Sequence, residues 1–121
     1  MTSEAQTHHA IDYIELAVTN MDDAKRFYES AFQWEFNAYG PEYAGIRKKR
    51  GEGEAGGLRL SDHVTTGGPL VILYSENLEQ SLEAVRQAGG VITTEPFSFP
   101  GGRRFQFCDP SGNELAVWSD K

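Results

Sequence analysis

The sequence contains one pattern twice, and the second copy lies 57 positions after the first. In the first copy an alternation of apolar and polar residues over 11–18 predicts a strand, and Asn20 favours the start of a helix. In the second copy a similar alternation over 70–75 predicts a strand, and Asn77 favours the start of a helix that ends at Gly89. Each copy alone would leave one face of its strands uncovered, so the two copies are expected to fold together.

We predict an α+β fold in which residues 1–121 form a single domain of two βαβββ modules, at about 9–61 and 68–119. The modules are expected to form one curved mixed sheet, a cup whose outer face is covered by the helices. Apolar alternation and turn residues place the later strands at 33–39, 43–49, 57–61, 91–94, 103–108 and 114–119. A segment rich in proline and glycine at 96–102 predicts a loop.

Charge and composition exclude several classes of protein. The chain has 18 Asp and Glu against 11 Lys and Arg, a net charge of −7 that repels phosphate backbones, so no nucleic-acid partner is expected. Its apolar runs are only a few residues long, whereas a membrane-spanning helix needs roughly 20, so no membrane segment is expected. Residues 1–6 show no secretion signal, and Cys108 is the single cysteine, so we expect a cytoplasmic location.

The order and spacing of these segments resemble the vicinal oxygen chelate superfamily, also called the glyoxalase/bleomycin resistance/dioxygenase proteins. The resemblance rests on 13–21 and 24–32 in the first module and on 77–90 in the second. The most specific segment is the run FCDPSGNEL at 107–115. Together these segments cover about 9–119. The resemblance implies a site inside the cup, often in a dimer, so a homodimer that binds a small molecule is expected.

The resemblance also implies where a divalent metal would bind. Enzymes of the family hold the metal on about four side chains, typically His and Glu, and the matching positions here are Tyr13, Arg59, Leu70 and Ala116. Leucine, alanine and arginine do not coordinate first-row divalent ions, so we predict no metal and no other cofactor at this place. His8, His9 and His63 leave a non-standard metal site open, although exposed terminal and loop histidines are the simpler interpretation.

Strand alternation indicates which side chains face the cup. If Ile14 and Leu16 face the helix, then Tyr13 and Glu15 face the cup. The same argument gives the full set of candidate ligand-binding residues, which is Tyr13, Glu15, Arg59, Leu70, Ile72, Tyr74, Ala116 and Trp118. An apolar, aromatic floor with a few polar groups is typical of a small-molecule pocket, and aromatic side chains can stack on a planar ligand.

Three functions are compatible with this pattern. The first is metal-free binding of a small organic molecule, such as a drug or a metabolite. The second is an enzyme of the glyoxalase (lactoylglutathione lyase) or dioxygenase type with an atypical site, in which Tyr13, Glu15 and Arg59 are the catalytic candidates. A structural ion pair between Glu15 and Arg59 is the alternative explanation for two of these residues. The third is a dimeric structural module without a ligand.

Overall fold

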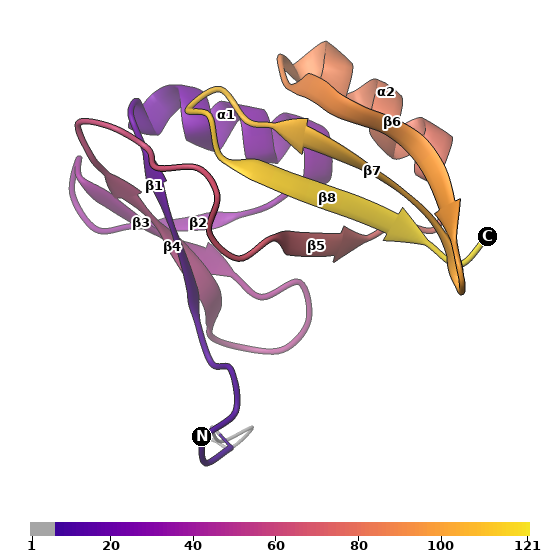
Figure 1. The fold of residues 1–121 in the computed structure, drawn as a ribbon. Helices are drawn as coiled ribbons and strands as arrows, with labels where there is room; N and C mark the ends of the chain where they lie inside the picture. Colours follow the sequence, from indigo (N-terminus) through magenta and orange to yellow (C-terminus); the bar gives the residue numbers. More distant parts are fainter. Residues whose placement is uncertain (1–6) are drawn as a thin grey trace.

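The computed structural model describes residues 7–121, and their elements follow one order twice (Figure 1). The first module consists of β1 (Ile14–Val18), α1 (Met21–Phe32), β2 (Phe36–Ala38), β3 (Tyr43–Arg47) and β4 (Glu54–Leu60). The second consists of β5 (Val71–Tyr74), α2 (Leu78–Ala88), β6 (Val91–Phe99), β7 (Gly102–Cys108) and β8 (Glu114–Ser119). The predicted α+β fold of two βαβββ modules is confirmed. Residues 1–6, and with them the expectation about a secretion signal, lie outside the described residues.

The strands form two four-stranded sheets, in the orders β1-β4-β3-β2 and β5-β8-β7-β6, and not the one continuous sheet that we expected. In each sheet the first strand of the module runs parallel to the last, and the other pairs are antiparallel. Near the end of β1, the backbone forms hydrogen bonds with side chains of the turn between β7 and β8. Asn113 Nδ2 donates to the carbonyl of Ala17 (2.6 Å), and the Thr19 N–H donates to Ser111 Oγ (2.9 Å). Backbone groups satisfied in this way have no need of a strand from the other module.

One hydrophobic core joins the two modules. The helices lie on the same side of the sheets and pack against each other (Figure 1). Phe27 of α1 contacts the second module, because its ring lies 6.0 Å from that of Phe107 on β7. The largest buried apolar side chains of this core are Val18, Phe27, Tyr28, Leu58, Leu78, Val85, Phe105, Phe107, Leu115 and Val117. No helix in the described part of the chain has the length and apolar character to cross a membrane.

Both helices begin as the sequence predicts. Asn20 Oδ1 accepts the N–H of Asp23 (2.9 Å), and Asn77 Oδ1 accepts the N–H of Gln80 (3.1 Å), so each asparagine satisfies a backbone donor of the first turn. At the other end of α2, Gly89 has a φ of 102°, a left-handed conformation that glycine adopts without strain. The repeat therefore extends to the caps of the helices.

The loop predicted at 96–102 is wrong, because β6 continues through Pro96 as far as Phe99. β6 is an edge strand, where the missing N–H of a proline costs no hydrogen bond to a neighbouring strand. Its register against β7 shifts between Ile92 and Thr94 and again between Thr94 and Phe97. These irregularities accommodate Pro96 and leave only a tight turn before β7.

Candidate functional site

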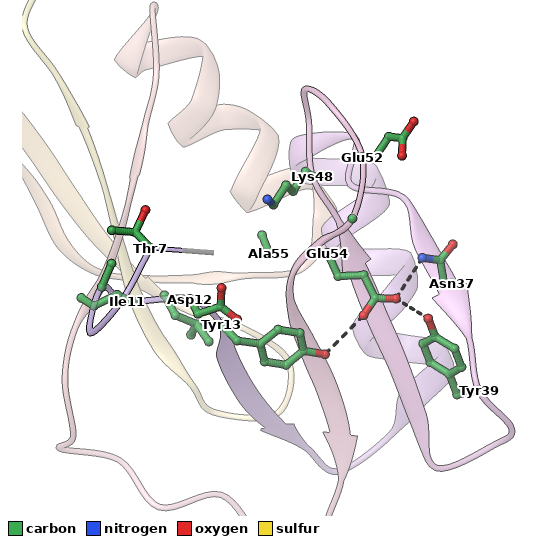
Figure 2. A pocket seen from close by; sticks show the side chains of 13 residues that line it. Thr7, Ile11, Asp12, Tyr13, Asn37, Tyr39, Lys48, Glu52, Glu54 and Ala55 are labelled. Atoms are coloured by element: carbon green, nitrogen blue, oxygen red, sulfur yellow. Dashed lines mark hydrogen bonds between the residues drawn. The ribbon is translucent and has the colours of Figure 1, made fainter. Parts of the chain in front are cut away.

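A hollow of about 830 Å³ opens beside the first sheet (Figure 2). Its walls come from the segment before β1, from β2 and from the hairpin between β3 and β4. The lining residues are Thr7, Ala10, Ile11, Asp12, Tyr13, Ile14, Asn37, Tyr39, Lys48, Glu52, Gly53, Glu54 and Ala55. The second module contributes none of them, so this hollow belongs to the first module alone.

Glu54 is the centre of a hydrogen-bonded group on the wall of the hollow. Its carboxylate accepts Asn37 Nδ2 (2.9 Å), Tyr39 Oη (2.5 Å) and, at a longer 3.5 Å, Tyr13 Oη (Figure 2). The hydrogen bonds from Asn37 and Tyr39, with that from Tyr13, keep the pKa of Glu54 below its usual value. Glu54 is therefore a carboxylate at neutral pH, fixed in position by its neighbours.

A second chain of contacts leads from Tyr13 across the sheet. The hydroxyls of Tyr13 and Tyr43 are 2.7 Å apart, and Tyr43 donates to Glu15 Oε2 (3.0 Å). Arg59 Nε in turn donates to Glu15 Oε1 (3.2 Å), and both side chains of this ion pair are about half exposed. Burial, the contact with Tyr13 and the hydrogen bond to Glu15 raise the pKa of Tyr43 well above that of a free tyrosine. Tyr43 therefore stays protonated at neutral pH.

Two glycines allow these side chains to lie flat on the sheet. Gly45 on β3 pairs directly with Gly57 on β4. A Cβ on Gly45 would overlap the carboxylate of Glu54, and a Cβ on Gly57 would overlap the hydroxyl of Tyr43 and lie 2.8 Å from that of Tyr13. A glycine inside a strand often marks the close approach of another group, and here it makes room for the network.

The structure divides the predicted ligand-binding residues between the two sheets. Tyr13, Glu15 and Arg59 are joined through Tyr43 in the network of the first sheet. The others, which are Leu70, Ile72, Tyr74, Ala116 and Trp118, lie on or next to the second sheet and do not line the hollow. Among them the rings of Tyr74 and Trp118 meet edge to face at 5.2 Å, whereas Ala116 is completely buried.

Sequence reasoning missed Tyr43, Asn37, Tyr39 and Glu54. One signal for Tyr43 was available: a glycine, Gly45, follows two residues later, on the same face of the strand. A glycine at that position leaves space beside the tyrosine for another side chain. The position of Glu54 had no such signal, because its partners come from two other segments, the one before β1 and the one around β2, that only the folded sheet brings next to it.

The four positions implied for a metal do not fit a divalent cation. Arg59 carries a positive charge that already pairs with Glu15, and Leu70 and Ala116 have no donor atom. Across residues 7–121, no group of three or more His, Cys, Asp or Glu side chains is placed to hold a metal. Among the three histidines, the rings of His8 and His9 stack on each other at 3.8 Å, and His63 lies in the segment after β4.

Comparison with known proteins identifies the family. The model of the Glyoxalase/Bleomycin resistance protein/Dioxygenase superfamily matches residues 10–117, and the chain belongs to this superfamily. The match confirms the resemblance seen in the sequence. No curated protein sequence matches the chain.

Solved structures share the fold at low sequence identity. One is a glyoxalase-related enzyme from Fulvimarina pelagi, with 19% identity, a TM-score of 0.77 and coverage of 92% of this chain and 88% of that one. A second is TnmS3, an antibiotic binding protein from Streptomyces sp. CB03234, with 19% identity, a TM-score of 0.69 and coverage of 95% and 98%. A third is TioX from Micromonospora sp. ML1, with 18% identity, a TM-score of 0.70 and coverage of 93% and 99%.

Proposed function

We propose that the protein binds a small organic molecule with a cationic group, and that the ligand occupies the hollow beside the first sheet. The observation that carries this proposal is the Glu54 carboxylate, held on the wall of the hollow by Asn37 and Tyr39. Among the described residues that line the hollow, the other charged ones are Asp12, Glu52 and Lys48, so the carboxylates there outnumber the single cation. A hollow of this charge attracts a positively charged ligand.

The protonation states of Glu54 and Tyr43 favour ligand binding over catalysis. A general acid or base works best when its pKa lies near the pH of the reaction. Glu54 has a lowered pKa and Tyr43 a raised one, so neither changes its charge near neutral pH. Fixed donors and acceptors of this kind orient a ligand, and this favours binding over the enzyme that the sequence left open. TnmS3, which shares the fold, is an antibiotic binding protein.

The proposal is tested by NMR titration of the 15N-labelled protein with benzyltrimethylammonium, a small aromatic cation. Its neutral counterpart benzyl alcohol and its anionic counterpart benzenesulfonate serve as ligand controls. We expect the cation to bind most tightly and to shift amide signals around the hollow. Comparable affinity for all three probes, or shifts confined to other parts of the molecule, would contradict the proposal.

Two variants assign the binding to the carboxylate. Glu54→Gln removes the charge but keeps a similar shape, and we expect it to weaken binding of the cation at least about tenfold, the scale of one charged hydrogen bond. Glu42→Gln is the matched control, because it removes the same charge from an exposed residue that does not line the hollow. Equal losses in the two variants would show that only the net charge of the protein matters.

We also propose that the protein forms a homodimer, as the family resemblance implies. Apolar side chains on edge strands support this: Ile14 on β1 is 41% exposed and Val91 on β6 is 63% exposed. Exposed apolar groups on an edge are an available surface for a second copy. Light scattering after size-exclusion chromatography should give a mass twice that of one chain, and a monomer at all concentrations would refute the proposal.

A further inference from the structure

One row of four side chains crosses the second sheet, with one residue from each strand. The pairing of the strands aligns Phe97 with Arg104, Arg104 with Trp118, and Trp118 with Tyr74. Phe105, which follows Arg104 on β7, is completely buried in the core. Because successive side chains point to opposite faces of a strand, Arg104 and Trp118 lie on the face away from the core.

Within residues 7–121, Arg104 is a cation without a counter-ion. Every other arginine in a helix or strand pairs with a carboxylate, namely Arg26, Arg47, Arg59, Arg86 and Arg103. Arg104 has no such pair among residues 7–121, and its one side-chain hydrogen bond there runs from Nη2 to Gln106 Oε1 (3.3 Å). Its Nε is buried and has no acceptor in the described part of the chain. A partly buried guanidinium with unused donors has lost hydration that only an acceptor or an anion restores.

Glu114, whose side chain lies on the same face of the sheet, is engaged elsewhere. Glu114 Oε2 accepts Thr93 Oγ1 (2.8 Å) and Gln106 Nε2 (3.2 Å). The amide of Gln106 therefore stands between Glu114 and Arg104, accepting from the arginine and donating to the glutamate. The guanidinium of Arg104 can therefore pair with an anion from outside the protein.

Aromatic side chains occupy the other three positions of this row. The guanidinium lies over the ring of Phe97, 5.3 Å from its centre. On the other side the rings of Trp118 and Tyr74 meet edge to face at 5.2 Å, and Tyr74 is held by a hydrogen bond from its hydroxyl to Asp120 (2.7 Å). Tyr74 is 49% exposed and Phe97 is 38% exposed. Large exposed rings held beside a cation form a surface on which a second flat ring can stack.

We propose that this row, Phe97–Arg104–Trp118–Tyr74, binds an aromatic carboxylate. The carboxylate pairs with the guanidinium of Arg104, and the ring of the ligand stacks on Trp118 or Tyr74. The charge preference is opposite to that of the hollow beside the first sheet, so the two sites take different ligands, and this inference stands without the proposed function. Sequence reasoning selected Tyr74 and Trp118 but not Arg104. That Arg104 has no carboxylate partner among residues 7–121 can be seen only in the folded sheet.

The test is an NMR titration with 1-naphthoate, with the neutral 1-naphthamide and the cationic 1-naphthylmethylammonium as ligand controls. We expect 1-naphthoate to bind at least about tenfold more tightly than either control, the scale of one charged hydrogen bond. The indole N–H signal of Trp118 should move, whereas that of Trp34, which stacks on Tyr28 at 4.5 Å against the core, should not. Equal affinity for the three probes, or no shift at Trp118, would overturn the proposal.

Variants of the two neighbouring arginines provide the matched comparison. Arg104→Gln should weaken binding of 1-naphthoate at least about tenfold, and Arg104→Lys should lose part of it, because lysine keeps the charge without the planar fork. Arg103→Gln removes the same charge from a side chain paired with Glu79 and should bind as the original protein does. Equal losses at the two arginines would refute the site. Glu54→Gln should leave 1-naphthoate binding unchanged. Failure of the site around Arg104 can therefore be distinguished from failure of the site in the hollow.

A second copy of the chain that covers the row is the competing explanation. In that case the titration shows no shift at Trp118 while light scattering gives a dimer, and this combination counts against the proposal. The circular dichroism spectrum and Tm of each variant show that it is folded. Should Arg104→Gln not fold, Arg104→Lys and the three naphthyl probes still decide the question.

Discussion

Gly45 and Gly57 face each other across β3 and β4, and the space above this pair holds the side chains of the candidate site. The hydroxyl of Tyr43 and the carboxylate of Glu54 lie where the Cβ atoms of other residues would be. The polar network thus depends on two residues that have no side chain. Removing that space is the most direct way to disturb the network without touching its polar groups.

We expect Gly57→Ala to displace Tyr43 and Tyr13 and to weaken binding of benzyltrimethylammonium about tenfold or more, because the new methyl group overlaps both hydroxyls. Overpacking of this kind typically costs about 1–3 kcal/mol of stability. Gly68→Ala is the control, since a Cβ there meets no atom within 4 Å. NMR titration and chemical denaturation measure both effects. Unchanged binding in Gly57→Ala would separate the network from the ligand site.

The stability of the protein should depend on the protonation of Glu54. Its folded-state pKa is lowered from 4.5 by Asn37 and Tyr39, so its ionised form stabilises the fold above pH 4.5, and this stabilisation is lost as the pH falls through the lowered pKa. We therefore expect the Tm difference between the original protein and Glu54→Gln to be constant from pH 8 to pH 5 and to shrink in more acidic buffer. Thermal melts across this range measure it. A difference that does not vary with pH would mean that the carboxylate is not stabilised by its neighbours.

Tyr28→Phe should destabilise the contact between the modules. The hydroxyl of Tyr28 on α1 donates to Asp109 Oδ2 (2.8 Å), a buried carboxylate in the turn before β8. Loss of a hydrogen bond to a charged group costs about 1.5–3 kcal/mol, and the ring that stacks on Trp34 is retained. Tyr74→Phe, which removes an exposed hydroxyl bonded to Asp120, should change the free energy of unfolding by less than about 0.5 kcal/mol. Urea denaturation compares the two, and equal effects would show that burial of the Tyr28 contact is unimportant.

The two helix caps should contribute similar amounts. Asn20→Ala and Asn77→Ala each remove one acceptor from a helix N-terminus, and each should lower the free energy of unfolding by about 1 kcal/mol. Serine at either position keeps a capping oxygen and should restore most of the loss. Guanidinium denaturation measures these differences. A cost near zero at one cap would show that the two repeats are not equivalent in this respect.

Much of the fold was predictable because it depends on local patterns. The alternation of apolar residues identified β1 and β5, and Asn20 and Asn77 marked the starts of the helices. Pro96 misled the prediction, because a proline disrupts a central strand but is tolerated on an edge, and the edge position of β6 is a property of the sheet.

The candidate site was only partly predictable. Alternation identified Tyr13, Glu15 and Arg59 as neighbours on one face, and the structure joins them. Alternation could not identify Glu54, because its hydrogen-bond partners depend on which strands lie next to each other. The same reason applies to Arg104, because its lack of a carboxylate partner within residues 7–121 depends on its surroundings in the folded sheet.

The sequence by itself determined the repeat, the order of the elements and the family, since each of these is written in the periodicity and spacing of neighbouring residues. Only the tertiary structure decided that the strands divide into two sheets and that Glu54 and Arg104 stand on different ones. The physical reason is that a strand pattern specifies which side chains share a face, whereas charge pairing, burial and the shape of a hollow arise between segments far apart in the chain.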